Sequence, residues 1–359
     1  MKKLYTLFPL LLLSVLVTGC FDSDSSNSTR SSQSSQDSNS YNGEGSNNDN
    51  NSNNNNKQNS KTTELYAKVI KKTGQTKSYN GSGQEVTDGS LKDDGFYQKG
   101  ATPQYQRDDS NNIVEDLATK LLWEDGESVE SNDHSYRSAK NYCENLSLGG
   151  KSWHIPSIKE FMSIVDYTKR APALDATFLN AAYGTDDVGY WSSTTRGLGW
   201  QMWLNFFSGK IHWYETSPNK HYVRCVSSNN SAWAKANFST SNTTVTDNNS
   251  KLEWQDSYSG TIPQLAWEEA IDYCENLTLG GKSDWRLPNI NELFSITEHS
   301  HGSPTINESF KNTKEDFYWS STTYSGSSSY AWVVSFEYGS NTYYPKSRKY
   351  SVRCVRSRE

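Results

Sequence analysis

The feature that most constrains this chain is an internal duplication. The stretch Tyr-Cys-Glu-Asn-Leu-Ser-Leu-Gly-Gly-Lys-Ser at residues 142–152 recurs at residues 273–283 with one change, from Ser147 to Thr278. A spacing of 131 residues is too long for a solenoid repeat and fits two whole domains in tandem. Other landmarks recur at nearly the same spacing: Trp123 and Trp254, Pro156 and Pro288, Trp191 and Trp319, and Cys225 and Cys354. We therefore expect two copies of one domain of about 120 residues.

The cysteines follow the duplication. Besides Cys20, each repeat carries one pair, Cys143 with Cys225 in repeat 1 and Cys274 with Cys354 in repeat 2. Four Cys allow three pairings, and the duplication selects these two disulfides, because each domain should close on itself. The alternative is that the four thiols serve in metal or redox sites, although the chain contains no Cys-x-x-Cys motif.

The first residues have the pattern of an export signal. Lys2 and Lys3 precede a mostly apolar run, Leu7–Val17, which is too short to span a bilayer as a stable helix. The run ends in Val17-Thr-Gly-Cys20, which has the form of a bacterial lipobox. We predict a signal peptide at residues 1–19 and acylation of Cys20, which anchors the protein in a membrane. The alternative is a simple secretory signal with a chance Cys. Cys20 is followed by Phe21 and not by Asp, which favours the outer membrane if the host has two membranes, although Asp22 counts against it. Surface exposure stays open.

The remaining chain divides by composition. Residues 20–63 are nearly all Ser, Asn, Asp, Gln and Gly, and we predict a disordered tether. Residues 64–109 have strand character and are expected to pack on repeat 1 as a β-rich lead-in. The two domains are predicted at residues 110–228 and 231–359. Twelve Trp and 22 Tyr, with few long aliphatic runs, are typical of β-rich domains with aromatic cores.

Repeat 2 shows the expected elements most clearly. Thr244–Asp247 and Lys251–Trp254 flank an Asn-rich turn and predict a β-hairpin. The residues Trp267, Ala270, Ile271, Cys274 and Leu277 recur at helical spacing, and we expect Gly280-Gly281 to end that helix. In repeat 1 the same stripe is Tyr136, Ala139, Cys143 and Leu146, followed by Gly149-Gly150.

A second helix is predicted after the proline of each repeat. Asn289–Glu292 and Ser157–Glu160 both have the form of a capping box, so we expect Glu292 and Glu160 to cap their helices rather than act as catalytic acids. Alternating Trp332, Val334 and Phe336 indicate a later strand. The fold class is α+β, with two helices and antiparallel strands in each of two tandem domains.

These residues together resemble the Lcl C-terminal domain family, which is named for a bacterial collagen-like adhesin. The resemblance covers residues 70–359. In repeat 2 it is carried by Val245–Asp247, Leu252–Trp254, Tyr273–Leu277, Asp284–Pro288, Asn291–Leu293, Tyr318–Thr323 and Val352–Arg356. It implies a fold related to the C-type-lectin-like and formylglycine-generating-enzyme-like domains, and attachment to sulfated polysaccharides and host surfaces. Repeat 1 departs from the pattern, because its Ser-Trp-His-Ile-Pro at 152–156 lacks the Asp and has His154 in place of the Arg.

The sequence shows no catalytic constellation. None of the six His has a counterpart in the other repeat, and the chain has no Gly-x-Ser-x-Gly, P-loop or dinucleotide motif. His299-Ser-His301 lacks a second group of metal ligands nearby. Asp116 and Asp247 recur, which leaves calcium binding open, although Asp in a hairpin turn usually bonds its own backbone. A net charge of −6 gives no reason to expect nucleic-acid binding. We expect no enzyme, no metal and no cofactor.

Basic residues near the C-terminus are the candidate site for an anionic ligand: Lys346, Arg348, Lys349 and Arg356. Arg353 recurs as Arg224 and is expected in a structural ion pair. Asp284 and Arg286, which flank Trp285, are expected to pair and lock their loop.

The sequence therefore predicts a binding protein of the cell envelope, lipid-anchored, that adheres to or recognises a polysaccharide or a surface protein. The alternatives are a structural subunit of an envelope assembly or an enzyme of unknown type, and oligomerisation stays open. Variable loops are expected to make the contacts: Asp125–Ser135, Tyr183–Gly189, Ser257–Gln264, His299–Glu315 and Tyr324–Tyr330.

Overall fold

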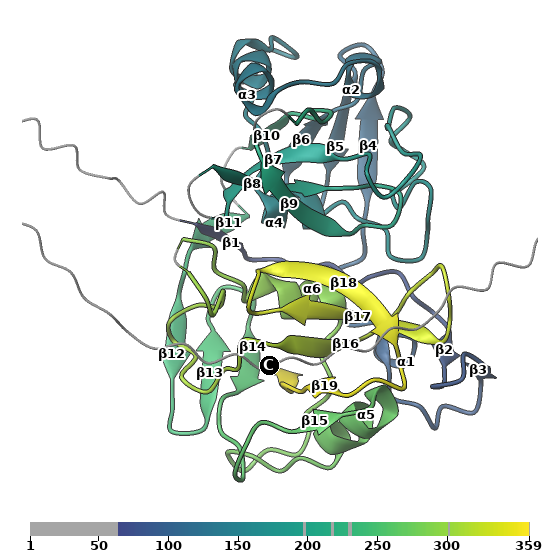
Figure 1. The fold of residues 1–359 in the computed structure, drawn as a ribbon, viewed down its shortest axis with the longest axis vertical. Helices are drawn as coiled ribbons and strands as arrows, with labels where there is room; N and C mark the ends of the chain where they lie inside the picture. Colours follow the sequence, from purple (N-terminus) through teal and green to yellow (C-terminus); the bar gives the residue numbers. More distant parts are fainter. Residues whose placement is uncertain (1–63, 197–198, 217–218, 229–231, 301, 359) are drawn as a thin grey trace, which may run out of the picture. The chain divides into compact units, whose positions relative to one another are not determined.

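The structure covers both repeats and the segment that precedes them. The computed structural model describes residues 64–196, 199–216, 219–228, 232–300 and 302–358 (Figure 1). All of these belong to one compact unit, Asn59–Glu359. The predicted signal peptide, Cys20 and the predicted tether lie outside the described residues. Over the described ranges, no helix has the length and apolar character needed to cross a membrane.

Each repeat contains a four-stranded antiparallel sheet built around the predicted hairpin. The strand order is β10-β6-β5-β4 in repeat 1 and β20-β14-β13-β12 in repeat 2. The bounds are β4 (Tyr105–Asp108), β5 (Ile113–Asp116), β6 (Leu121–Glu124) and β10 (Val226–Ser228), and β12 (Phe238–Thr240), β13 (Thr244–Asp247), β14 (Leu252–Gln255) and β20 (Val355–Ser357). The prediction of the repeat 2 hairpin is thus confirmed, with the second strand shifted by one residue.

The Asp that recurs in this hairpin holds its own turn. In repeat 2, Asp247 accepts hydrogen bonds from the Asn249 backbone N–H at 2.9 Å and from the Ser250 hydroxyl at 2.7 Å. In repeat 1, Asp116 accepts from the Thr119 hydroxyl at 2.6 Å. These contacts are what an Asp at the start of a tight turn provides.

A second sheet in each repeat starts from the shared Tyr-Trp-Ser-Ser-Thr-Thr motif. Repeat 1 has the order β7-β8-β9, and repeat 2 has β15-β19-β16-β17-β18. The bounds are β7 (Tyr190–Thr195), β8 (Trp200–Leu204) and β9 (Ile211–Glu215), and β15 (Gln264–Leu265), β16 (Phe317–Thr323), β17 (Tyr330–Ser335), β18 (Ser340–Pro345) and β19 (Tyr350–Ser351). Neighbouring strands are antiparallel, apart from β16 and β19, which are parallel.

The Ser and Thr of this motif satisfy buried backbone groups. The register of β16 shifts between Trp319 and Thr323, which interrupts the ladder. The buried Ser320 hydroxyl donates to the Trp332 carbonyl at 2.8 Å, and the Thr322 hydroxyl accepts the N–H of Ile290 at 3.0 Å. Repeat 1 makes the same contacts from Ser192 and Thr194. The motif therefore joins the second sheet to the second helix in both repeats.

The first long helix of each repeat is where the periodicity places it. It is α3 (Tyr136–Asn145) in repeat 1 and α5 (Trp267–Glu275) in repeat 2. The expectation that the Gly-Gly pair ends the helix is wrong, since α5 ends at Glu275, five residues before Gly280. Leu279 and Lys282 exchange backbone hydrogen bonds at 3.0 Å around Gly280 and Gly281, whose φ angles are +61° and +71°. Two residues with positive φ form a type I′ turn, which glycine adopts most easily.

Both predicted disulfides are present. Cys143 pairs with Cys225 and Cys274 with Cys354. Each bond joins a buried position of the first helix to the residue just before the closing strand, β10 or β20, and all four Cys are fully buried. Each repeat is therefore covalently closed on itself.

The second helix of each repeat is short and capped as predicted. It is α4 (Ile158–Met162) in repeat 1 and α6 (Ile290–Ser295) in repeat 2, and both begin with a complete capping box. The remaining helices, α1 (Asp94–Tyr97) and α2 (Ser128–Ser131), are single turns. The fold is mixed α+β with few helices and mostly antiparallel strands, arranged as two tandem domains.

The lead-in does not pack on repeat 1 alone, which corrects the prediction for residues 64–109. Its strand β1 (Leu65–Ala67) pairs with β11 (Trp233–Lys235), which follows repeat 1, while β2 (Ser78–Tyr79) and β3 (Glu85–Val86) form a small hairpin. The Lys71 ammonium is buried and lies 2.7 Å from Asp116 in repeat 1.

The middle of the lead-in, from Gln75 to Lys99, contacts repeat 2, whereas its last strand, β4, belongs to the sheet of repeat 1. The Gln75 side chain accepts the N–H of Thr323 at 3.0 Å, the Asn289 amide donates to the Lys99 carbonyl at 3.1 Å, and Tyr97 bonds Glu275. The prediction failed because hydrogen bonds between residues more than 170 positions apart leave no periodic signal in the sequence.

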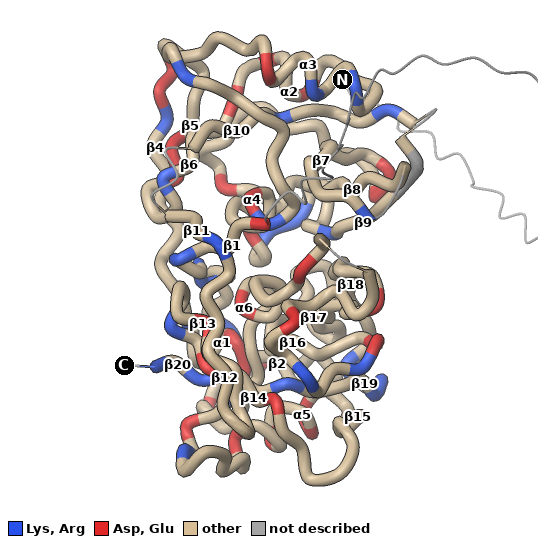
Figure 2. Tube along the Cα trace, turned by 90° about the vertical axis from the view of Figure 1, so that its left-hand side faces the viewer, with Lys and Arg blue, Asp and Glu red and all other residues tan. Residues whose placement is uncertain are grey.

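Equivalent elements of the two repeats meet each other. Helix α4 contacts α6, and the β8–β9 hairpin lies against β18 (Figures 1 and 2). The Tyr167 ring packs edge-on against Trp332 at 5.2 Å, and the Asn341 amide accepts the N–H of Ile211 at 2.8 Å and donates to the Gly209 carbonyl at 3.1 Å. A patch that packs on its own counterpart indicates an approximate two-fold relation. The repeats are therefore not independent units, although each is closed by its own disulfide.

Candidate functional site

The structure separates the four basic residues that the sequence groups near the C-terminus. Lys346 is only 1% exposed and does not belong to a surface site, which corrects that part of the prediction. Its ammonium donates to the Tyr79 carbonyl at 2.5 Å and to the Thr323 hydroxyl at 2.9 Å, and it lies 3.7 Å from the centre of the Trp267 ring. Burial lowers the pKa of Lys346 to about 7. Lys346 thus ties the lead-in to repeat 2.

Arg356 and its neighbours form a paired network. The Arg356 guanidinium donates to Glu253 at 2.7 Å and to Asp284 at 2.7 Å. Asp284 therefore pairs with Arg356. The sequence-based expectation that it pairs with Arg286 is wrong. Arg286 is buried against Glu292, with N–O distances of 2.7 and 2.6 Å. Asp284 and Arg286 therefore have different partners, although only Trp285 separates them in the sequence.

Arg353 and Arg224 form the structural ion pairs that their recurrence predicted. Both guanidinium groups are fully buried. Arg353 lies 3.0 Å from Asp256, and Arg224 lies 2.7 Å from Asp125. Each also donates to backbone carbonyl groups of its own repeat, Gln255 O in one case and Glu124 O in the other. Neither Arg is available to a ligand.

Arg348 and Lys349 are the exposed remainder of the basic group. Together with Phe317, Tyr344 and Tyr350 they form what we call the basic-aromatic tip. The Arg348 guanidinium lies 5.0 Å from the centre of the Tyr344 ring, and Lys349 approaches Glu269 only at 4.0 Å. Phe317 packs on both tyrosines, at 5.3 and 5.5 Å.

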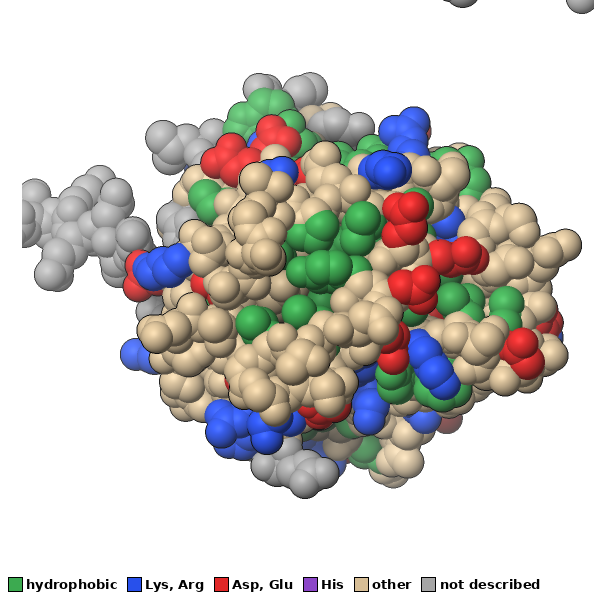
Figure 3. Space-filling view, turned by 90° about the horizontal axis from the view of Figure 1, so that it is seen from below, with side chains coloured by type: hydrophobic (Ala, Val, Ile, Leu, Met, Phe, Trp, Pro, Cys, Tyr) green, Lys and Arg blue, Asp and Glu red, His purple; other side chains and the backbone are tan. Residues whose placement is uncertain are grey.

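The exposed charges do not form one uniform basic face. On the face shown in Figure 3, Lys and Arg gather at several separate places, with Asp and Glu between some of them and hydrophobic side chains in the middle. Figure 2 shows the same interspersion of signs along the trace. A ligand that needs a broad basic surface is therefore not favoured by these views.

Repeat 1 departs from the family pattern at His154, and its ion pair with Glu160 is longer and more exposed than the Arg286–Glu292 pair of repeat 2. His154 stands where repeat 2 has Arg286, and its ring nitrogen lies 3.4 Å from Glu160. Burial acts to lower the pKa of His154, but the hydrogen bond and negative charge of Glu160 outweigh it, so the pKa is raised. The His154 side chain is 47% exposed, whereas that of Arg286 is 5% exposed. The buried pair of repeat 2 has thus become a surface contact in repeat 1.

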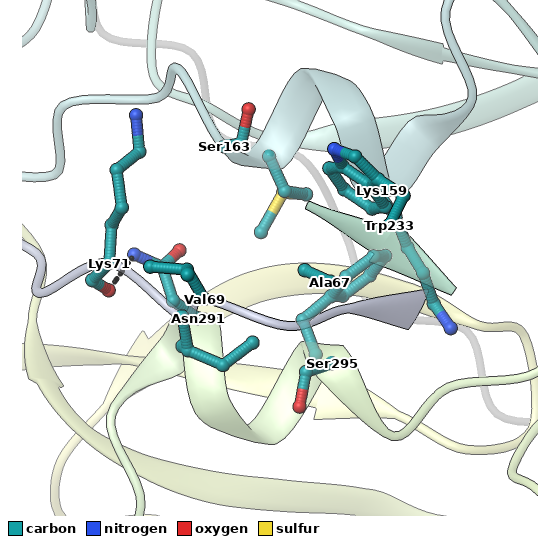
Figure 4. Close-up of a pocket in the computed structure, with 11 residues that line it drawn as sticks. Ala67, Val69, Lys71, Lys159, Ser163, Trp233, Asn291 and Ser295 are labelled. Carbon is teal, nitrogen blue, oxygen red and sulfur yellow. Dashed lines mark hydrogen bonds between the residues drawn. The ribbon is translucent and has the colours of Figure 1, made fainter. Parts of the chain in front are cut away.

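An apolar gap lies where α4 meets α6 and the lead-in (Figure 4). It is lined by the backbone and short side chains of Ala67 and Val69, by Met162 and Phe294, and by the Trp233 ring. Its volume of about 40 Å³ leaves room for a few water molecules at most. The Lys71 side chain extends away from it in Figure 4. This gap is therefore a packing defect at the two-fold contact and not a ligand site.

Two larger clefts lie where the repeats meet, and they are built from equivalent parts. In each, the tip of a hairpin after the Tyr-Trp-Ser-Ser-Thr-Thr motif of one repeat faces the loop after the second helix of the other. One cleft combines Arg196 and Trp200 of repeat 1 with Ser300 and Ser303 of repeat 2. The other combines residues 323–328 of repeat 2 with Thr168 of repeat 1. We call them the Trp200 cleft and the serine groove.

The Trp200 cleft has a volume of about 500 Å³ and holds an unusually placed arginine. The Arg196 guanidinium lies 4.6 Å from the centre of the Trp213 ring and 4.4 Å from that of Tyr338, which belongs to the other repeat. Among the described residues, no side chain or backbone carbonyl accepts a hydrogen bond from this guanidinium. Trp200 beside it is 39% exposed. Glu337 places one negative charge on the same cleft.

Sequence reasoning did not single out Arg196 or Trp200. The signal was present as a difference between the copies, because Arg196-Gly-Leu-Gly-Trp200 replaces Tyr324–Tyr330 directly after a motif that is otherwise identical. A departure at an equivalent position inside a near-identical frame marks a place where the two copies have acquired different surfaces.

The described residues contain no group of three or more His, Cys, Asp or Glu side chains arranged to hold a metal ion. His299 is engaged by Glu64 at 3.2 Å and by the Gly339 carbonyl at 2.8 Å, and His301 lies outside the described residues. The prediction that this protein is not an enzyme stays a prediction.

We compared the sequence with models of known protein families. The Lcl C-terminal domain matches twice, over residues 112–227 and 243–356, and together the matches cover more than half of the chain. The chain therefore belongs to the Lcl C-terminal domain family, with two tandem copies, which confirms the resemblance seen in the sequence. No curated protein of known function matches it.

Proposed function

We propose that this protein is a lipid-anchored binding protein of the cell envelope that recognises a polysaccharide bearing acidic groups through the Trp200 cleft. The C-type-lectin-like relationship, which the family resemblance implies, belongs to this proposal. The observation that carries it is Arg196, whose guanidinium lies over the neighbouring rings of Trp213 and Tyr338 with its donors unused among the described residues. A planar guanidinium suits the two oxygens of a carboxylate or sulfate.

The surroundings of Arg196 fit a sugar that carries such a group. An exposed Trp offers a flat apolar surface beside the charge, and the hydroxyl-bearing residues Ser300 and Ser303 also line the cleft. A cleft of about 500 Å³ is within the range of pockets that hold small ligands. The basic-aromatic tip, with Arg348 and Lys349 exposed, supplies a second surface of the same chemistry for a long chain.

The lipid anchor is tested separately from the ligand. If Cys20 is acylated, Cys20→Ser should move the protein from the membrane fraction to the soluble or secreted fraction, because about 0.8 kcal/mol per buried CH₂ of membrane affinity is lost. Fractionation of cells followed by mass spectrometry of the N-terminal peptide measures both location and acylation. An unmodified Cys20 in membrane-bound protein would refute the anchor.

The ligand is tested with Arg196→Gln on the full-length protein. Binding to an array of acidic and neutral polysaccharides, with heparin as one probe, is expected to weaken about 10- to 100-fold for acidic members, since a charge-assisted hydrogen bond contributes about 1.5–3 kcal/mol. Arg137→Gln is the matched control, because Arg137 is an exposed Arg on α3 and its removal changes the net charge equally. Equal losses in both variants would mean that only overall charge matters. Arg348→Gln measures how much the basic-aromatic tip contributes to the binding of acidic polysaccharides.

A structural subunit of an envelope assembly is the second candidate. This role is favoured by two large apolar side chains that a protein partner could cover, Leu179 and Tyr183, which are 65% and 46% exposed. Tyr183 begins the predicted contact loop Tyr183–Gly189. An array on which every polysaccharide is silent, combined with a partner protein crosslinked at Tyr183 in cells, would favour this role over polysaccharide recognition.

A further inference from the structure

The serine groove is the counterpart of the Trp200 cleft, but its lining is of a different chemical kind. It has a volume of about 590 Å³. Residues 323–328 form one wall, Thr168 lies at the junction with repeat 1, and Gln75, Thr76 and Tyr79 of the lead-in form the other wall. Most of these side chains carry a hydroxyl or an amide.

The walls of the groove are held in place without a ligand. The Gln75 side chain bonds both backbone groups of Thr323, accepting its N–H at 3.0 Å. The Tyr324 ring stacks on Tyr343 at a centroid distance of 3.6 Å and an angle of 7°. Gly326 lies against this ring so closely that an added Cβ would be 2.5 Å from it. Lys346 clamps the Tyr79 carbonyl from below at 2.5 Å.

The groove is nearly free of charge. Among the described residues that line it, Lys77 is the one charged side chain, and its ammonium is already paired with Glu85 at 2.9 Å. The equivalent position to Arg196 is occupied by Tyr324, which is 5% exposed. A charged ligand would lose its hydration in this groove without gaining an opposite charge, whereas an uncharged ligand with many hydroxyl groups needs no such charge.

Two hydroxyl groups of the groove make no hydrogen bond with the described residues. Neither the Thr76 nor the Tyr79 hydroxyl has a hydrogen-bond partner among the described residues, although both side chains line the groove. Thr76 is exposed and Tyr79 is half-buried. Most other polar groups of the walls are engaged, as in Ser325, which donates to the Lys169 carbonyl at 3.0 Å, and Ser328, which donates to the Gly83 carbonyl at 2.7 Å.

We propose that the serine groove is a second binding site, and that its ligand is an uncharged oligosaccharide. The pre-formed walls, the hydroxyl and amide lining, the neutral character and the two unused hydroxyl groups together define this class of ligand. The inference goes beyond the proposed function, because it concerns a different site with the opposite charge requirement. The two clefts of the interface have thus diverged, one toward acidic sugars and one toward neutral sugars.

The test uses the full-length protein and uncharged oligosaccharides of glucose, galactose, mannose and N-acetylglucosamine as probes. Thr76→Val and Tyr79→Phe remove one hydroxyl each and break no hydrogen bond among the described residues, so each should weaken binding about 2- to 10-fold. Ser327→Trp, which places a large ring in the groove, should abolish binding. Tyr183→Phe is the control, since it removes an exposed hydroxyl from another loop.

Salt and the variants separate this site from the Trp200 cleft. Binding of the neutral probes should change by less than about twofold between about 20 mM and about 500 mM NaCl, because no ion pair forms. Arg196→Gln should leave it unchanged. Failure of every neutral probe to bind, or binding that survives Ser327→Trp, would overturn the inference and leave the acidic-sugar function standing. Capture of peptides in place of sugars by the groove would overturn it as well. If Arg196→Gln leaves the binding of acidic polysaccharides unchanged, that result counts against the proposed function alone and not against the serine groove.

Discussion

Replacing Cys274 and Cys354 together by Ala is expected to lower the free energy of unfolding by about 4.5 kcal/mol. The bond closes a chain segment whose ends are 80 residues apart, and the loss of that constraint on the unfolded chain has about this size in the chain-entropy model. Ala is preferred to Ser because both sulfur atoms lie in a fully buried cluster with Trp267, Trp285 and Trp319. Urea denaturation followed by Trp fluorescence measures the change.

The duplication supplies the control for this experiment. Cys143 and Cys225 are 82 residues apart, so the matched double variant in repeat 1 should lose nearly the same free energy. Reduction of the native protein should reproduce both losses together. If neither double variant changes the urea midpoint, then the two bonds do not stabilise the fold, and packing alone closes each repeat.

Glu292→Gln is expected to destabilise the protein by about 3–5 kcal/mol. The variant leaves the Arg286 guanidinium, 5% exposed, without its counter-charge, and an uncompensated buried charge has a cost of about this size. Glu292 also accepts the N–H of Asn289 at 2.9 Å as the capping residue of α6, a contact that the Gln oxygen preserves in part. The measured quantity is again the free energy of unfolding in urea.

Repeat 1 provides a matched comparison for Glu292. Glu160 caps α4 in the same way, but its partner is His154, which is 47% exposed. Glu160→Gln should therefore cost about 1 kcal/mol or less. The double variant Arg286→Met with Glu292→Met should recover part of the loss, because it removes both buried charges. Equal costs for Glu292→Gln and Glu160→Gln would show that the cap, and not the buried pair, carries the effect.

Features that depend on neighbouring residues could be predicted from the sequence. The β13–β14 hairpin, the stripe of α5 and the capping boxes of α4 and α6 each lie within about fifteen residues of chain, where periodicity and turn chemistry act directly. The disulfides were predictable for a different reason, because the duplication shows which two Cys belong to one unit.

Features that depend on distant partners were missed or misassigned. Asp284 and Arg286 are close in sequence, but their partners are Arg356, which is 72 residues away, and Glu292, on the following helix. Lys346 looked like part of a basic surface, yet the lead-in covers it. The Trp200 cleft was not predicted, since Arg196 and Tyr338 belong to different repeats.

The sequence by itself determined the two domains, their internal covalent closure and their local elements, because duplicated residues and short-range patterns record these directly. Only the tertiary structure decided that the copies pack on each other, that the lead-in spans both, and that two unlike clefts open between them. The physical reason is that contacts across the interface join residues 100 or more positions apart, as in the hydrogen bond from the Ile211 N–H to the Asn341 side chain. Such contacts depend on the shapes of folded surfaces, and a linear pattern does not encode them.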